Sequence, residues 1–356
     1  MEISAEMQRL LAFARQENAS DIHIVAGLPP LLRINGEIVL SNVAPLTKQD
    51  TARLSMGLLN EEQQKVFLRD WQICCSVHDA KQGRFRVSIY YREGNPEMSI
   101  RPVMHHVGTR EELKLPEMVE DFTRYASGLV LLTGPTGSGK TTTLNFMIDL
   151  INSERRCKIV TIEDPIEFVH QQKRAIVVQQ ELRADVRSFS AALRHVLRQD
   201  PDVIVVGEMR DLETMSTALT AAETGHLVLA TLHTPNALQT VERVVSAFPA
   251  DQQNQVIAQL ANSLEGIIAQ LLLPRHDRKG RVLATEILIV NMAVRSIIRD
   301  NSLHQLTSVM QTGRRMGMQT MDACLQDLYD SAVISHEIYT AHAIERRDTG
   351  AREDKG

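Results

Sequence analysis

Residues 129–144, LVLLTGPTGSGKTTTL, decide the fold of this chain. The stretch opens with an apolar run typical of a buried strand and closes with a segment typical of a helix. Between them, GPTGSGKT (134–141) matches the phosphate-binding pattern G-x-x-x-x-G-K-[ST]. Strand, glycine-rich loop and helix in this order are the context that the motif requires. The sequence therefore predicts a phosphate loop within an α/β fold.

Each residue type in this loop has a physical role. The glycines permit backbone angles at which successive N–H groups converge on phosphate oxygens, and the following helix adds the positive end of its dipole. Lys140 can reach the β- and γ-phosphates of ATP, and the Thr141 hydroxyl can bind Mg²⁺. The alternative is a glycine-rich turn with a chance lysine. The predicted nucleotide-binding residues are Gly134, Pro135, Thr136, Gly137, Ser138, Gly139, Lys140, Thr141 and Thr142.

Three more short and almost uncharged runs follow the loop, at 159–162, 203–206 and 227–230. Together with residues 129–133 they alternate with helical patterns, which predicts a parallel sheet covered by helices on both faces. The last third of the chain, from Asp251, is expected to be mostly helical. Ligands bind at the carboxyl ends of parallel strands, so polar residues that follow these runs are candidate site residues.

Two acids and two histidines stand at the ends of these runs. Glu163 follows the second run and Glu208 follows the third, where carboxylates can hold a metal and orient water; alone, each could be a solvated strand-end acid. His226 precedes the fourth run and His233 follows it. His233 can contact a γ-phosphate or the attacking water, and the alternative for both histidines is capping of strand ends. A zinc site is not expected, because no cysteine lies near them in sequence.

Composition limits the class of protein. The 356 residues include 39 Lys and Arg against 44 Asp and Glu, a formal net charge of −5, and 43% are hydrophobic. This length favours two domains, and without an overall positive charge no nucleic-acid partner is expected. No run approaches the roughly 18 apolar residues of a membrane span. Four cysteines, of which Cys74 and Cys75 are adjacent, favour a reducing cytosol, and these two are expected to pack as small residues.

The chain is expected to have five parts. They are an N-terminal α+β domain over residues 1–105, a linker over 106–124, an ATPase core over 125–290, a C-terminal helical region over 291–344 and a disordered tail over 345–356. In the first domain, GRFRVSIYYR (83–92) alternates as a strand, with Phe85, Val87 and Ile89 on one face and Arg84, Arg86 and Ser88 on the other.

Four segments carry a family resemblance. GPTGSGKTTTL, TIEDPIEFVH, LRQDPDVIVVGEMRDLETM and ETGHLVLATLHT resemble, in order and spacing, the Walker A, Asp box, Walker B and His box signatures of the secretion ATPase superfamily. Further segments, ASDIHIVAGLPPLLRINGEI, GRFRVSIY and VRSIIRDNSLHQL, resemble the type IV pilus retraction ATPases of the PilT/PilU type. The resemblance covers nearly the whole chain.

The resemblance implies a RecA-like core behind a PAS-like N-terminal domain. It implies a cytoplasmic homohexamer, docked at the inner membrane, that hydrolyses ATP to drive pilus retraction and twitching motility. The implied partners are a PilC-like platform protein of the inner membrane and a paralogous pilus ATPase. Only Cys157 and Cys324 follow the loop, so the tetracysteine metal insertion of extension and type II secretion ATPases cannot be built. The alternatives are a type IV secretion or conjugation ATPase and an accessory subunit.

The resemblance also implies roles for the candidate residues. Glu163 would be the general base or water-orienting acid and Glu208 would support Mg²⁺ and water, although these two roles could be exchanged. His233 would sense the γ-phosphate. Arg86 and Arg101 would act in trans on the transferring phosphoryl group; the alternative for Arg86 is a solvated strand face. The further candidates are His226 and Arg210.

Overall fold

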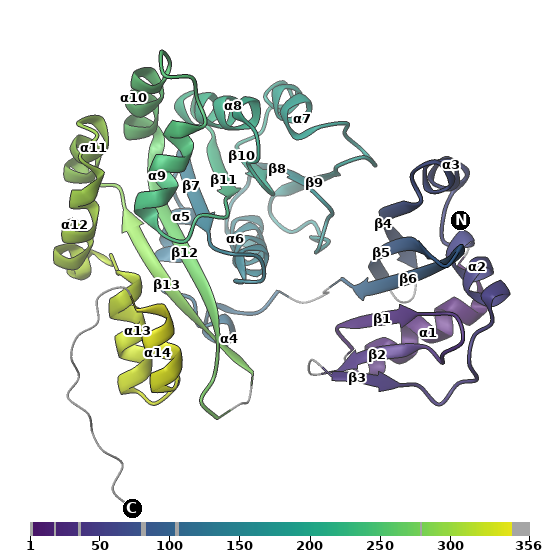
Figure 1. Cartoon of the computed structure of the whole chain (residues 1–356). Coiled ribbons are helices and arrows are strands. Elements are labelled where there is room, and N and C mark those ends of the chain that lie inside the picture. Colours follow the sequence, from purple (N-terminus) through teal and green to yellow (C-terminus); the bar gives the residue numbers. More distant parts are fainter. Residues whose placement is uncertain are drawn as a thin grey trace, which may run out of the picture. The chain divides into compact units, whose positions relative to one another are not determined.

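The computed structural model describes residues 3–17, 19–34, 37–79, 83–103, 107–277 and 280–343. It divides into two compact units (Figure 1). One comprises Met1–His106 with Pro165–Val169, and the other Val107–Asp164 with His170–Gly356. The predicted tail over residues 345–356 lies outside the described residues.

The N-terminal unit is built on a six-stranded antiparallel sheet in the order β3-β2-β1-β6-β5-β4. Its helices α1 and α2 contribute side chains to the same core as the sheet. The strands and helices are β1 (Asp21–Ile24), β2 (Leu31–Ile34), β3 (Glu37–Leu40), β4 (Gln72–Asp79), β5 (Gly83–Arg92), β6 (Asn95–Pro102), α1 (Ala5–Gln16), α2 (Lys48–Met56) and α3 (Glu61–Asp70).

The core of this unit follows the predicted alternation. Phe85, Val87 and Ile89 of β5 are at most 1% exposed. Cys75 of β4 is buried, but Cys74 is exposed. The expectation that both cysteines pack inside was therefore wrong for Cys74, because neighbouring residues of a strand face opposite sides of the sheet.

The second unit contains a seven-stranded sheet in the order β13-β12-β7-β11-β10-β8-β9. All neighbours are parallel except β13, which runs antiparallel to β12. This confirms the predicted α/β fold with a parallel sheet. The strands are β7 (Gly128–Thr133), β8 (Lys158–Glu163), β9 (Ile176–Glu181), β10 (Val203–Val206), β11 (Leu227–Thr231), β12 (Leu264–Pro274) and β13 (Arg281–Ile289).

Helices cover both faces of this sheet (Figure 1). In β7, Leu129 and Leu131 join a core with helices α7–α12, whereas Val130 and Leu132 join a second core with α5 and α6. Burial on both faces explains why these strands carry almost no charge. The helices are α4 (Arg110–Leu113), α5 (Met118–Thr123), α6 (Lys140–Glu154), α7 (Phe189–Val196), α8 (Leu212–Glu223), α9 (Ala237–Ser246), α10 (Gln253–Ser263), α11 (Met292–Arg299) and α12 (Leu306–Thr312).

The expectation of a mostly helical last third was wrong in one place. Strands β12 and β13 pair antiparallel from Gly266↔Ile289 to Pro274↔Arg281 and extend the sheet by two long strands. Their apolar runs cannot be separated from a buried helix by periodicity alone. After β13 the described chain is helical, through α11, α12, α13 (Met321–Asp330) and α14 (His336–His342). None of the described helices is long and apolar enough to cross a membrane.

Candidate functional site

The glycine-rich loop connects β7 to α6, as predicted. Gly134, Gly137 and Gly139 have φ angles of 135°, 81° and 95°. A Cβ atom on Gly134 would lie 2.3 Å from the carbonyl oxygen of Gln270 and 2.7 Å from Oγ of Ser138. No side chain fits there. Position 134 therefore requires glycine both because of this close approach and because of its positive φ angle.

Lys140 is the first residue of α6 and is 8% exposed. Its Nζ donates to the carbonyl oxygens of Gly134, at 2.6 Å, and Pro135, at 2.9 Å. Burial lowers the pKa of Lys140, and the negative charge of Glu208 opposes that shift. The ammonium group therefore lies against the loop backbone, where phosphate oxygens would compete with two carbonyls for its protons. Thr141 follows in the same first turn and is half-buried.

The structure brings Glu208 and His233 together at the carboxyl ends of the neighbouring strands β10 and β11. Oε1 of Glu208 lies 2.9 Å from Nε2 of His233, and Oε2 accepts from the Arg210 guanidinium at 2.7 Å. The hydroxyl of Thr231 also donates to the carbonyl oxygen of Gly207, which joins the ends of the two strands. Because β11 lies between β7 and β10, His233 leaves the sheet between the phosphate loop and Glu208.

The charge of Glu208 is set by two opposing effects. Burial alone would raise the pKa of this carboxyl. The hydrogen bonds and positive charges of Arg210 and His233 outweigh burial, and the net pKa lies below its usual value. Glu208 is thus held as an anion with two cationic or proton-donating partners, which suits it to metal and water contacts better than to accepting a proton.

Glu163 occupies the last position of β8, beside β10, and is 7% exposed. Its Oε1 accepts from the Thr161 hydroxyl at 2.7 Å and from Nε2 of Gln179 at 3.0 Å. Both of these donors are neutral. Gln179 lies on β9, a strand that was not predicted from the sequence. The available signal was the pair Gln179-Gln180 directly after the apolar residues 176–178, which places polar groups inside a further strand.

The structure does not bring His226 together with these residues. It precedes β11, so the whole strand separates it from His233, a distance of about 17 Å for five residues. Nδ1 of His226 lies 3.0 Å from the carbonyl oxygen of Ala221, and its own carbonyl oxygen accepts from the N–H of Gly128. These contacts match the capping alternative.

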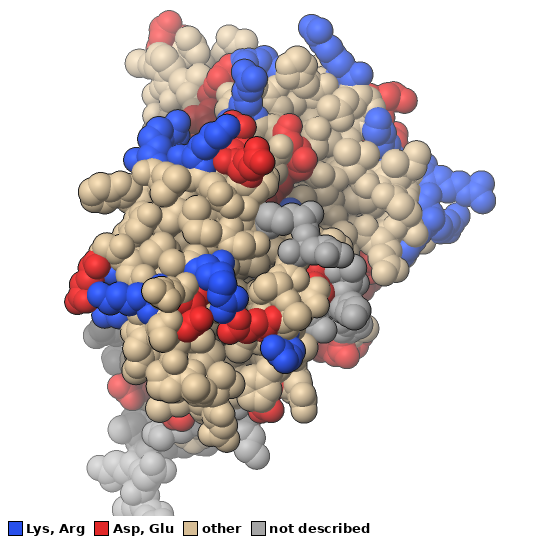
Figure 2. Space-filling model, turned by 90° about the vertical axis from the view of Figure 1, so that its right-hand side faces the viewer, with Lys and Arg blue, Asp and Glu red and all other residues tan. Residues whose placement is uncertain are grey.

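Arg86 and Arg101 face one another on β5 and β6 of the N-terminal unit. Arg101 forms an ion pair with Asp21 at 2.8 Å and keeps 62% of its side chain exposed. Arg86 is half-buried. On the side of the molecule drawn in Figure 2, lysines and arginines form several separate groups, some of them beside acidic residues.

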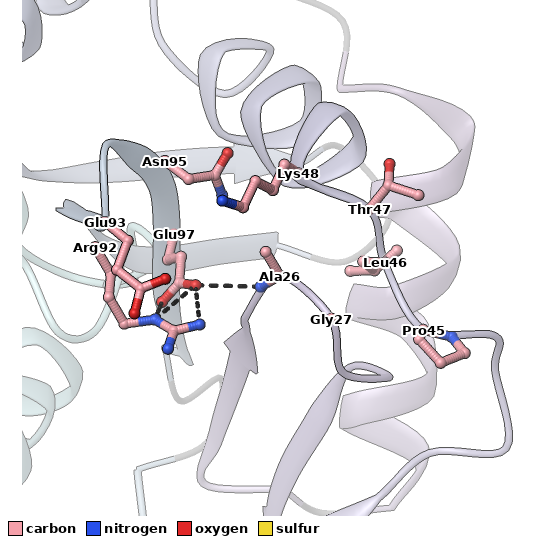
Figure 3. A pocket seen from close by; sticks show the side chains of 10 residues that line it. All are labelled: Ala26, Gly27, Pro45, Leu46, Thr47, Lys48, Arg92, Glu93, Asn95 and Glu97. Carbon is pink, nitrogen blue, oxygen red and sulfur yellow. Dashed lines mark hydrogen bonds and ion pairs between the residues drawn. The ribbon is translucent and has the colours of Figure 1, made fainter.

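A pocket of about 370 Å³ lies in the N-terminal unit (Figure 3). Glu97, 1% exposed, accepts from the N–H of Ala26 at 3.2 Å and forms an ion pair with Arg92 at 2.9 Å. These contacts connect β6 with the segment after β1. None of the predicted site residues lines this pocket. Its lining consists of Ala26, Gly27, Pro45, Leu46, Thr47, Lys48, Arg92, Glu93, Asn95 and Glu97.

The site fits magnesium bound together with a nucleotide. Within the part of the chain that the structure describes, no three His, Cys, Asp or Glu side chains form a group that could hold a metal ion. The Thr141 hydroxyl and the Glu208 carboxylate nevertheless provide the oxygen ligands that Mg²⁺ prefers when substrate phosphates supply the others. The negative charge of Glu208 acts on the pKa of Lys140, the residue that precedes Thr141.

Comparison with known proteins agrees with this geometry. The model of the family described as "Type II/IV secretion system protein" matches residues 95–353. The chain belongs to this family. Among its relatives in Pseudomonas aeruginosa, the type IV pilus retraction ATPase PilT is 44% identical over 93% of this chain and 96% of its own. The type IV pilus ATPase PilU of the same organism is 40% identical over 96% of this chain and 90% of its own.

A solved structure of this secretion family also matches nearly the whole chain. The crystal structure of the pilus retraction motor PilT with bound ADP superposes with a TM-score of 0.89 at 44% identity. The match covers 95% of this chain and 96% of that one. The predicted resemblance to the secretion ATPase superfamily, and within it to PilT-type ATPases, is confirmed.

Proposed function

We propose that the protein is an ATPase motor that drives type IV pilus retraction and thereby twitching motility. The observation that carries this proposal is a phosphate loop with the buried Lys140, beside neighbouring strands whose ends carry the hydrogen-bonded pair Glu208 and His233. The N–H groups of that loop and a buried lysine are suited to nucleotide phosphates. We propose the pilus as the structure on which the motor acts, because the retraction ATPase PilT is 44% identical to this protein over almost the full length of both chains.

In the proposed reaction the loop and Lys140 bind the phosphates, and His233 contacts the γ-phosphate. Glu163 accepts a proton from the attacking water. Its carboxylate lies at the carboxyl end of β8, where the Thr161 hydroxyl and the Gln179 amide, both neutral, donate hydrogen bonds to it. Glu208 and Thr141 would hold Mg²⁺, which when bound would neutralise charge on the nucleotide phosphates.

The proposal includes assembly. The motor is a homohexamer that docks on a PilC-like platform protein at the cytoplasmic face of the inner membrane, and a paralogous pilus ATPase is a second partner. Arg86 and Arg101 contribute positive charge to the site of a neighbouring subunit. An arginine supplied in this way can raise the rate about 10³- to 10⁵-fold, so turnover should depend on assembly.

ATP turnover by the purified protein tests the site. Lys140→Ala and Glu208→Ala should each lower turnover at least about 100-fold, because each removes a charge that acts on the transferring phosphoryl group. Lys173→Ala is the matched control, since Lys173 forms a surface ion pair with Asp149 and lies outside the loop. Wild-type turnover in both site variants would contradict the assignment.

Mixed rings test the trans arginines. Arg101→Ala and Lys140→Ala subunits should each be inactive alone, and mixing them should restore part of the turnover, because some interfaces then combine an intact loop with an intact arginine. Wild-type turnover that does not depend on protein concentration would argue against sites at subunit interfaces.

A further inference from the structure

A continuous series of hydrogen bonds connects Glu163 with the helix of the phosphate loop. Gln179 donates from Nε2 to Oε1 of Glu163 at 3.0 Å, and its own Oε1 accepts from the backbone N–H of His170 at 2.9 Å. Nε2 of His170 lies 2.9 Å from Oδ1 of Asn145 in α6. His170 and Asn145 are 5% and 8% exposed. The series therefore runs through the interior, between the candidate base and the phosphate loop.

The orientation of the Gln179 amide follows from its partners. A backbone N–H can only donate, so the amide oxygen must face His170 and the amide NH₂ group must face Glu163. In the ladder between β8 and β9, Gln179 lies opposite Thr161, and Thr161 and Glu163 share one face of β8. Two donors from adjacent strands thus meet at the same carboxylate oxygen.

The middle of the series is neutral. Burial lowers the pKa of His170 to about 4, so its ring is uncharged at pH 7. Because Oδ1 of Asn145 is an acceptor, Nε2 carries the proton of the ring. The amide oxygen of Gln179 is therefore held by a directional hydrogen bond from the backbone of a neutral residue.

We propose that Gln179 is a positioning residue for ATP hydrolysis, which holds the Glu163 carboxylate where it can accept a proton from the attacking water. Through the N–H of His170 and through Asn145, the amide of Gln179 is fixed relative to α6 and so to the bound phosphates. This inference rests on the proposed ATPase function and on Glu163 as its base. Gln179 does not touch ATP; it acts through Glu163.

Single-turnover hydrolysis of radiolabelled ATP, which detects slow reactions, tests this role. Gln179→Leu keeps the volume of the side chain and removes its donor, so the rate should fall roughly 10-fold or more, as expected for losing a hydrogen bond to a charged group. The apparent affinity for ATP should stay within about twofold, because ground-state binding does not use Glu163. Gln180→Leu is the matched control on the other face of β9 and should hydrolyse at the wild-type rate.

The double variant separates positioning from a general loss of structure. In a Glu163→Gln background, Gln179→Leu should change the rate less than about twofold, because its effect passes through the carboxylate that is already absent. An equal fall in both backgrounds, or a weakened ATP affinity in Gln179→Leu, would overturn the inference. A wild-type rate in Glu163→Gln would instead contradict the proposed role of Glu163. A slow Glu163→Gln with an unaffected Gln179→Leu would overturn only the role of Gln179.

Discussion

At the scale of single residues, the phosphate loop depends on the absence of a side chain at Gly134. Its φ angle is 135°, and a Cβ atom would lie 2.3 Å from a backbone oxygen of β12. Gly134→Ala should therefore displace the loop and weaken nucleotide binding at least about tenfold, which corresponds to about 1.4 kcal/mol. Titration with a fluorescent ADP analogue measures this.

Gly225→Ala is the control for that experiment. Gly225 also has a positive φ, of 101°, but a Cβ atom there would meet no atom within 4 Å. The control carries backbone strain without the clash, so it should bind the analogue almost as the wild type does. Equal affinities of Gly134→Ala and wild type would show that the loop does not need this close approach.

His170 should make stability depend on pH. Its pKa is lowered to about 4 in the folded protein from an ordinary value of 6.5. Between these pH values the unfolded chain binds more protons than the folded protein. The contribution of His170 to the free energy of unfolding is therefore complete above pH 6.5 and is lost as the pH falls towards 4. Its full size is about 3 kcal/mol. In urea unfolding, the free energy of unfolding should fall less between pH 7.5 and 4.5 for His170→Gln than for wild type. An equal fall in both proteins would refute this prediction.

Most candidate site residues could be predicted because their chemistry follows strand ends. Glu163, Glu208 and His233 each come directly after an uncharged run, so their place at the carboxyl edge of the sheet followed from sequence. Gln179 also follows an apolar run, residues 176–178, but its contact with Glu163 could not be predicted in this way. Its role depends on which strand lies next to β8, and no local sequence pattern predicts the order of strands in a sheet.

At the scale of elements, the predicted strands are those buried on both faces. Strand β10 has the predicted bounds, and β7 and β11 differ from them by one residue at one end, because an uncharged run ends sharply at the first polar residue. β12 and β13 were missed. Their runs are long, and Glu265, Gln270 and Glu286 interrupt them at spacings that a helix also allows.

One of these interrupting residues joins three elements. Glu286 of β13 is 7% exposed and accepts from the N–H of Ala237 at 2.7 Å and of Met321 at 3.3 Å. These are the first residues of α9 and α13, where backbone donors lack partners within the helix. Burial raises the pKa of Glu286, which these two hydrogen bonds oppose. The carboxyl group therefore connects the segment after His233 with the C-terminal helices.

Hydrogen exchange should reveal this connection. Glu286→Ala leaves both N–H groups buried without an acceptor, at a cost of about 1–3 kcal/mol each, so exchange in the first turns of α9 and α13 should accelerate about 10- to 100-fold. Glu286→Gln retains one acceptor oxygen and should change exchange less. Helix α6 is the internal control, and acceleration spread equally over α6, α9 and α13 would show general destabilisation.

At the scale of the whole molecule, the sequence predicted a parallel ATPase sheet and a separate N-terminal α+β part, and the two units of the structure agree with both. Subunit assembly follows from neither unit alone. Arg86 and Arg101 are paired in register on one face of the N-terminal sheet, whereas Lys140, Glu208 and His233 belong to the other unit. Their cooperation in a ring therefore stays a proposal that the mixed-subunit experiment tests.

The central claim, that ATP hydrolysis by this protein removes pili, is tested most directly in the native bacterium. Surface pili and twitching motility are measured in a deletion strain that carries the wild-type gene, Lys140→Ala or no gene. Without the gene, and with Lys140→Ala, the cells should carry excess pili and not twitch, while the wild-type gene restores both properties. Cells without pili in the deletion strain, or normal motility with Lys140→Ala, would contradict the account.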